Sequence, residues 1–185
     1  MKKGTIIKKV NTKNIVLNGV MIALTFLATR IISIPGPIAP GVINLGDAVI
    51  IITAILLGGK SGMLVGAIGS ALADITFPGG FVFAPVTFIV KGIEGYIVGE
   101  LATRGETKGR RQTYRIVAVI AGALAMVFGY FVAEAFILSL FDGTFGFTFA
   151  VAELPFNLVQ GGISALVAYI LSSILLKADV RAYLH

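Results

Sequence analysis

Long apolar runs separated by short polar segments are the feature that most constrains this chain of 185 residues. The runs cover residues 13–33, 42–57, 62–77, 81–103, 114–141 and 149–176. A helix rises about 1.5 Å per residue, so the longer runs can cross a hydrocarbon core of about 30 Å, whereas the second and third are marginal in length. Such runs are too long and too numerous for an ordinary soluble core.

The composition agrees with a lipid environment. Hydrophobic residues make up 57% of the chain and the mean hydropathy is +0.97, so the chain carries more apolar surface than one soluble core can hide. We therefore predict an all-α membrane protein. It is expected to be a single domain over residues 1–185, folded as a six-transmembrane-helix bundle.

The basic residues lie on alternate connections between the runs, and they predict the orientation of the bundle. All of the 15 Lys and Arg residues except Arg30 and Lys91 lie near the termini or near the connections after the second and fourth runs. Because cytoplasmic loops carry an excess of Lys and Arg, we predict cytoplasmic termini and a multi-pass location in the cell membrane. Asp47 and Asp142 are then expected in outer loops. Topology accounts for the basic charge, so no nucleic-acid partner is expected.

Cys and His, which often serve as catalytic or metal-binding residues, are nearly absent from the sequence. It has no Cys, and its single His is the last residue, His185. We therefore expect no enzyme activity, no catalytic residue, no cofactor and no metal site. The turn at residues 58–61 reads Gly-Gly-Lys-Ser but lacks the earlier glycine of a phosphate-binding loop, so energy from ATP must come through a partner.

Polar side chains inside the apolar runs are candidates for a binding site, because each is costly in a bilayer unless it is paired or faces a cavity. In the sixth run, Glu153, Asn157 and Gln160 are spaced i, i+4 and i+7, so a helix places them on one stripe. The fourth and fifth runs carry similar polar pairs at comparable depth. The predicted substrate-binding residues are Asn44, Thr87, Lys91, Tyr130, Glu134, Glu153, Asn157 and Gln160. Together with nearby phenylalanines they predict a pocket in the outer half of the bilayer.

Purely structural roles are alternatives for several of these residues. Lys91 and Glu94 are spaced i, i+3 and can neutralise each other inside the bundle. Asn157 and Gln160 can join helices through hydrogen bonds without any ligand. Arg30 can extend its charged end to the outer headgroups. The binding hypothesis rests on the shared depth of several polar positions.

Small residues recur at helical spacing in two of the runs. The third run carries Gly62, Gly66 and Gly69, and the first carries Gly19 and Ala23 at i, i+4. Such spacing lets helix backbones approach closely, either within the chain or against a partner.

Three stretches, at residues 43–48 (INLGDA), 56–62 (LLGGKSG) and 66–74 (GAIGSALAD), resemble the substrate-binding S components of energy-coupling factor (ECF) vitamin transporters. The resemblance extends over nearly the whole chain. It implies a membrane subunit that binds a micronutrient and docks on a transmembrane T component driven by two cytoplasmic ATPase subunits. It also implies that Gly19 and Ala23, in place of two alanines spaced AxxxA, contact the T component.

We therefore expect the substrate-capture subunit of an ATP-driven ECF importer, with no ATPase of its own. Its expected ligand is a small B-vitamin-type heteroaromatic, with pyridoxine or the hydroxymethyl-pyrimidine precursor of thiamin favoured. Lys91 and Gln160 can donate hydrogen bonds to such a ring, and Glu134 and Asn157 can accept them. Riboflavin and pantothenate are alternative ligands.

A stand-alone secondary transporter or channel for a small polar solute is the alternative class. Such a protein is expected to show a repeated hydropathy half, or a polar path through both leaflets. The inner halves of the runs are mostly apolar, which disfavours this alternative.

Overall fold

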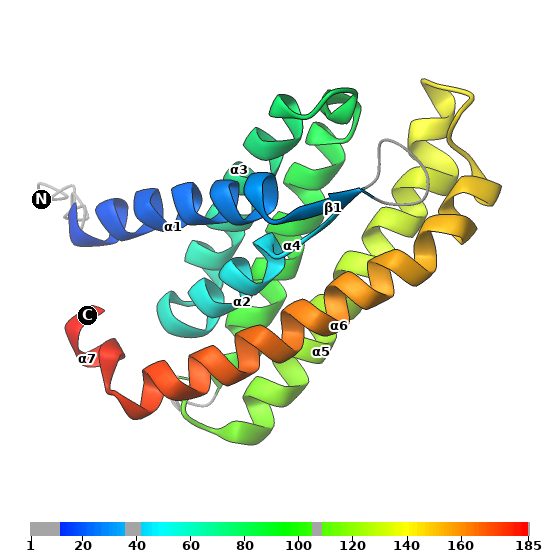
Figure 1. The fold of residues 1–185 in the computed structure, drawn as a ribbon. Coiled ribbons are helices and arrows are strands. Elements are labelled where there is room, and N and C mark those ends of the chain that lie inside the picture. The colour runs from blue at the N-terminus through cyan, green and yellow to red at the C-terminus, as the bar shows by residue number, and fades with distance from the viewer. Residues whose placement is uncertain (1–11, 36–41, 105–108, 185) are drawn as a thin grey trace, which may run out of the picture.

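The computed structural model describes residues 12–35, 42–104 and 109–184, and this part of the chain is predominantly helical. The long helices are α1 (Thr12–Ile31), α2 (Gly46–Leu57), α3 (Gly59–Thr76), α4 (Ala84–Ala102), α5 (Gln112–Val132) and α6 (Phe147–Lys177). They pack together as one bundle (Figure 1). Each apolar run thus corresponds to one of these helices within a few residues, except that α5 ends at Val132 and the rest of the fifth run forms other helical turns.

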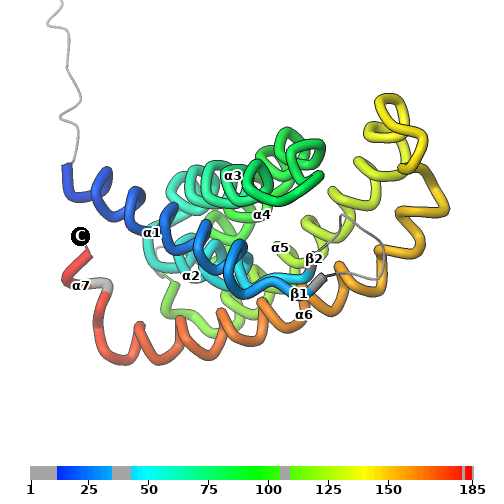
Figure 2. The backbone as a smooth tube through the Cα atoms, turned by 45° about the horizontal axis from the view of Figure 1, so that its top comes forward, coloured from blue at the N-terminus to red at the C-terminus, as the bar shows by residue number. Residues whose placement is uncertain are grey.

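Shorter elements connect the helices. They are β1 (Ser33–Pro35), β2 (Val42–Asn44), the 3-10 helices η1 (Gly80–Val82) and η4 (Leu138–Leu140), the π-helix η3 (Ala133–Ile137) and the terminal helix α7 (Val180–Leu184). The β1–β2 pair, η1 and η4 lie at one end of the bundle, which we call the hairpin end. The start of α1 and helix α7 lie at the opposite end (Figure 1, Figure 2).

The β1–β2 pair is a short addition to a predominantly helical fold, as predicted, but it corrects the expected position of Asp47. We expected the second helix to begin near residue 42, with Asp47 in an outer loop. Instead β1 and β2 are antiparallel, with Ser33 opposite Asn44, and α2 begins only at Gly46. Asp47 therefore lies in the first turn of α2 and is buried. The strand pair turns the chain back into the bundle, so a polar residue close to the loop becomes part of the interior.

Asp142 does lie at the surface, in the connection between η4 and α6. The backbone N–H of Thr144 donates a hydrogen bond of 2.8 Å to Oδ1 of Asp142. This bond lowers the pKa of the Asp142 carboxyl below its ordinary value. The two aspartates expected in loops thus have opposite environments.

Glycines let α3 and α4 pack in direct backbone contact. A Cβ atom added to Gly95 would lie 2.2 Å from the carbonyl oxygen of Gly62, and one added to Gly66 would lie 2.3 Å from the carbonyl oxygen of Lys91. Gly69 approaches α1 in the same way, since its Cβ would lie 2.9 Å from the carbonyl oxygen of Ile22. The predicted role of these small residues in close helix packing is confirmed within the chain.

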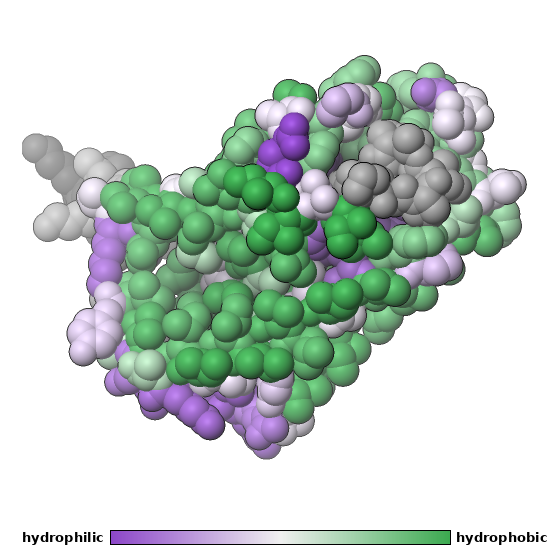
Figure 3. Space-filling view, viewed as in Figure 1, coloured by the Kyte–Doolittle hydropathy of each residue, from purple (hydrophilic) through white to green (hydrophobic). Residues whose placement is uncertain are grey.

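The flanks of the bundle are apolar. Ile120, Leu124 and Phe128 form an exposed stripe on α5, and Ile163 and Leu166 are exposed on α6. Figure 3 shows this hydrophobic surface along the bundle, with hydrophilic atoms gathered toward the end that carries α7. Apolar patches of this extent are typical of surfaces that contact lipid or a partner.

Three helices of the described chain are long and apolar enough to cross a membrane: Thr12–Ile31, Gln112–Leu140 and Phe147–Lys177. The second of these is α5 continued through η3 and η4. α2 is apolar but shorter, with 12 residues. The chain is a helical membrane protein.

Candidate ligand-binding site

A cavity lies at the hairpin end of the bundle. Its volume is about 540 Å³ when the open space at its mouth is included. Its walls are formed by Asn44, Asp74, Phe77, Gly80, Phe83, Thr87, Tyr130, Glu134, Glu153, Asn157 and Gln160. These residues come from β2, α3, α4, α5, η3, α6 and the α3–α4 connection.

The cavity brings together every predicted binding residue except Lys91. Its residues on α6, Glu153, Asn157 and Gln160, share one wall, as their helical spacing predicts. Of the residues in the walls, Phe77 and Gly80 carried no polar or periodic signal in the sequence. Both lie where α3 ends and the chain turns toward η1, so only the turn at Pro78-Gly79 pointed to this region.

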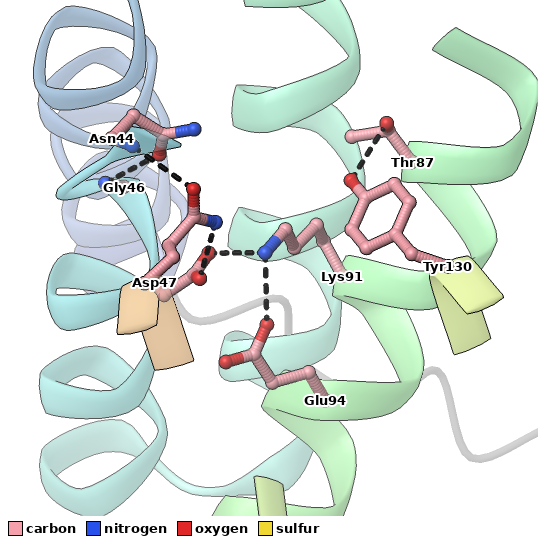
Figure 4. A network of polar contacts seen from close by, with 8 residues as sticks. Asn44, Gly46, Asp47, Thr87, Lys91, Glu94 and Tyr130 are labelled. Atoms are coloured by element: carbon pink, nitrogen blue, oxygen red, sulfur yellow. Dashed lines mark hydrogen bonds and ion pairs between the residues drawn. The ribbon is translucent and has the colours of Figure 1, made fainter. Parts of the chain in front are cut away.

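Lys91 lies behind the cavity wall, in a buried ion cluster with Asp47 and Glu94. Its Nζ atom donates a hydrogen bond to Oδ1 of Asp47 and lies 3.5 Å from Oε2 of Glu94 (Figure 4). All three side chains are at most 3% exposed. The alternative in which Lys91 and Glu94 pair is therefore confirmed, and Asp47 is a further partner that the sequence did not indicate. Two carboxylates surround one ammonium, so Lys91 is engaged by protein groups.

A chain of hydrogen bonds connects this cluster to the cavity. Gln160 Nε2 donates to Oδ2 of Asp47 at 2.9 Å, and the backbone N–H of Asn44 donates to Gln160 Oε1 at 2.9 Å. The backbone N–H of Gly46 in turn donates to Asn44 Oδ1 at 2.9 Å (Figure 4). Both ends of the Gln160 carboxamide are thus held by protein. The Asn44 side-chain N–H₂ group has no partner among these bonds.

Aromatic rings form the other part of the wall. The hydroxyls of Tyr130 and Thr87 are 2.8 Å apart, and the Lys91 ammonium lies 5.2 Å from the centre of the Tyr130 ring. Phe83 packs edge to face on Phe145, with ring centres 5.3 Å apart. Phe77 lies beneath the Arg30 guanidinium at 4.4 Å. Fixed rings beside polar groups suit a flat ligand with polar edges.

Glu134 enters the cavity from the π-helix η3, which interrupts the regular geometry of the apolar helical segment Gln112–Leu140. A π-turn is wider than an α-turn, and π-turns often occur at functional sites. Glu134 is 3% exposed and Glu153 is 5% exposed. One carboxylate oxygen of each, Glu134 Oε2 and Glu153 Oε1, is buried without a hydrogen-bond partner in the described structure.

Gly19 and Ala23, predicted to dock a partner, lie outside the cavity lining, on the exposed face of α1. A Cβ atom added to Gly19 would have nothing within 4 Å. The buried residues of α1 are Thr25 and Thr29, so the face that carries Gly19 and Ala23 points away from the described bundle.

The bundle, its apolar flanks and the cavity at one end define a helical membrane protein with a polar cavity between its helices. A family model described as the S component of ECF-type riboflavin transporters matches residues 9–177. The chain therefore belongs to the family of ECF-type S components, which are substrate-binding subunits of transporters. The resemblance recognised in the sequence is confirmed.

Two relatives were found. An "uncharacterized protein in gap 3'region" of Pyrococcus woesei is 35% identical over 135 residues, which is 72% of this chain and 82% of the relative. The thiamine precursor transporter HmpT of Lactococcus lactis subsp. cremoris (strain MG1363) is 27% identical over 172 residues, or 92% of each chain. The second likeness covers nearly all of both proteins.

Proposed function

We propose that this chain is the substrate-capture subunit of an ATP-driven ECF importer in the cell membrane. The observation that carries the proposal is the cavity at the hairpin end, where polar side chains from six helical and strand elements line one space in a chain of the S-component family. A structural bundle would not require such a polar space. In this proposal the cavity faces outward and loads the ligand there.

The proposed topology has six spans and cytoplasmic termini. Two features support it. The start of α1 and helix α7 lie at the same end of the bundle (Figure 1), and basic residues occur at helix ends on that side. Lys60 lies in the first turn of α3, Arg110 and Arg111 precede α5, and Lys177 ends α6. Excess Lys and Arg mark the cytoplasmic side, so the hairpin end faces outward.

The proposed ligand is a small B-vitamin-type heteroaromatic, with the hydroxymethyl-pyrimidine precursor of thiamin ranked before pyridoxine. The relative HmpT, a thiamine precursor transporter, supports this order. The wall also suits such a ring, since Phe77, Phe83 and Tyr130 can pack on its faces. Asn44 and Asn157 can bond to its polar edge. Riboflavin, named in the family description, and pantothenate are the competing ligands.

The proposed partners are a transmembrane T component and two cytoplasmic ATPase subunits. The exposed face of α1 supports a docking role for Gly19 and Ala23, because small residues there allow a partner helix to approach. Energy from the ATPases then moves the loaded subunit.

Ligand binding by the purified chain tests the proposal. We expect native mass spectrometry to find a B vitamin or vitamin precursor bound, and calorimetric titration with hydroxymethyl-pyrimidine, pyridoxine, riboflavin and pantothenate to identify it. Uptake into vesicles is expected only when the T component and ATPases are present. Uptake by the chain alone would instead favour the stand-alone transporter, and failure to bind any member of the panel would contradict the proposal.

A further inference from the structure

The charged residues that line the cavity are all acidic. Asp74, Glu134 and Glu153 line it, and no Lys, Arg or His of the described chain does. The two cations nearest to it have other contacts: Lys91 is bound by Asp47 and Glu94, and Arg30 stacks on Phe77. The cavity therefore presents carboxylates without a matching protein cation.

Glu134 and Glu153 are also incompletely bonded. Both side chains are at least nine-tenths buried, and Glu134 Oε2 and Glu153 Oε1 have no hydrogen-bond partner among the described residues. Leaving a buried carboxylate oxygen without a donor is unfavourable, because the lost hydration is not replaced. Two such oxygens, from η3 and from α6, border the same space.

A contrast within the protein shows what these carboxylates lack. Asp47 is equally buried, but it accepts hydrogen bonds from Lys91 and Gln160. Both oxygens of Glu94 also lack a hydrogen-bond partner among the described residues, but Glu94 lies 3.5 Å from the same ammonium, which compensates its charge. In the cavity a bound ligand can supply the corresponding donors, and hydrogen bonds to a charged group are the stronger ones.

We propose that the cavity selects a ligand that binds as a cation. The ligand has an amidine-like edge, in which an amino group lies next to a basic ring nitrogen, and this edge faces Glu134 and Glu153. This inference rests on the proposed function and specifies its ligand class. An aminopyrimidine protonated on the ring nitrogen next to its amino group presents two parallel N–H donors, which match the two oxygens of a carboxylate. A neutral ring without this edge leaves the glutamates unsatisfied, and an anion such as pantothenate is repelled.

The test compares two probes of nearly equal size on the purified full-length chain: 4-amino-5-hydroxymethyl-2-methylpyrimidine and its 4-oxo analogue, which cannot form the cationic edge. We expect wild type to bind the amino probe about tenfold to a hundredfold more tightly, the effect of losing one charge-assisted hydrogen bond. Glu134→Gln and Glu153→Gln are each expected to weaken the amino probe by a similar factor and to leave the oxo probe unchanged or tighter. The matched control is Glu100→Gln, an exposed carboxylate of α4 outside the cavity, which is expected to bind as wild type does.

The wild-type comparison decides the matter even if a glutamine variant fails to fold. Equal affinity for the two probes, tighter binding of riboflavin or pantothenate, or glutamine variants that bind the amino probe as wild type does would each overturn this inference and leave the capture function intact. If wild type binds neither probe and no member of the vitamin panel, the proposed function fails as well.

Discussion

The Nζ atom of Lys91 on α4 donates a hydrogen bond to Oδ1 of Asp47 in the first turn of α2, inside the bundle. Asp47 also accepts a hydrogen bond from Gln160, whose side chain lines the cavity. The buried ion cluster and the candidate ligand site are therefore one continuous network. In this arrangement Lys91 is held by Asp47 and Glu94 outside the cavity lining, and the direct ligand contact that we expected from the sequence stays a prediction.

Replacing Lys91 should destabilise the protein more than replacing either of its partners. Lys91→Met leaves Asp47 and Glu94 as two buried carboxylates without a cation, which is expected to cost about 3–5 kcal/mol. Asp47→Asn leaves the Lys91–Glu94 pair and should cost less. Thermal unfolding in detergent measures both. Arg110→Met, which breaks an exposed ion pair with Asp179, is the control and should change the Tm little. Equal Tm values for Lys91→Met and Arg110→Met would contradict the role of the cluster.

The contact between α3 and α4 should not tolerate even one methyl group at Gly95. Gly95→Ala places a Cβ atom against the carbonyl oxygen of Gly62, so the helices must separate, at a cost of about 1–3 kcal/mol. Gly162→Ala on α6 is the matched control, because nothing lies within 4 Å of its Cβ position. We expect a lower Tm for the first variant and an equal or higher Tm for the second. A Tm for Gly95→Ala equal to that of wild type would show that the backbones are farther apart.

Gln160 should affect ligand affinity through the position of Asn44. Gln160→Leu removes the acceptor of the Asn44 N–H and a donor to Asp47, so β2 loses its anchor to α6. We expect ligand affinity, measured by calorimetry, to fall by about tenfold or more. Gln112→Leu makes the same substitution at an exposed position in the first turn of α5 and should bind as wild type does. Unchanged affinity in Gln160→Leu would mean that the ligand does not depend on this wall.

The docking role of α1 predicts a separation of binding from transport. Ala23→Trp fills the space that a partner helix would use, so uptake by the assembled importer should be lost while the isolated subunit still binds ligand. Leu124→Trp, on the exposed face of α5, is the control and should keep both activities. Loss of ligand binding together with uptake in Ala23→Trp would point to a folding defect and count against docking there.

The topology can be mapped directly because the chain has no native Cys. Gly143→Cys is exposed at the hairpin end with open space around its Cβ, and Lys60→Cys is exposed near the opposite end. A membrane-impermeant maleimide should label Gly143→Cys in intact cells, and Lys60→Cys only after permeabilisation. Wild type is the unlabelled control, and the reverse labelling pattern would invert the proposed orientation.

The helices and much of the site could be predicted because they depend on local pattern. Apolar runs ended by Pro-Gly and Gly-Gly pairs gave helix bounds close to those observed, and helical spacing placed Glu153, Asn157 and Gln160 on one wall. The π-helix around Glu134 was not predictable in this way, since its residues continue the same apolar run. The β1–β2 pair was missed because three-residue strands carry no periodic signal.

The sequence by itself determined the membrane environment, the succession of helices and the family, since hydropathy, charge and short motifs are properties of neighbouring residues. Only the tertiary structure decided which polar groups are satisfied and which remain open. Lys91 and Asp47 are 44 positions apart, and Asp47 and Gln160 are 113 apart, so their contacts exist only once α2, α4 and α6 have packed. Within the described part of the chain, that packing supplies donors to Asp47 but none to Oε2 of Glu134 and Oε1 of Glu153, a difference that no local sequence pattern could show.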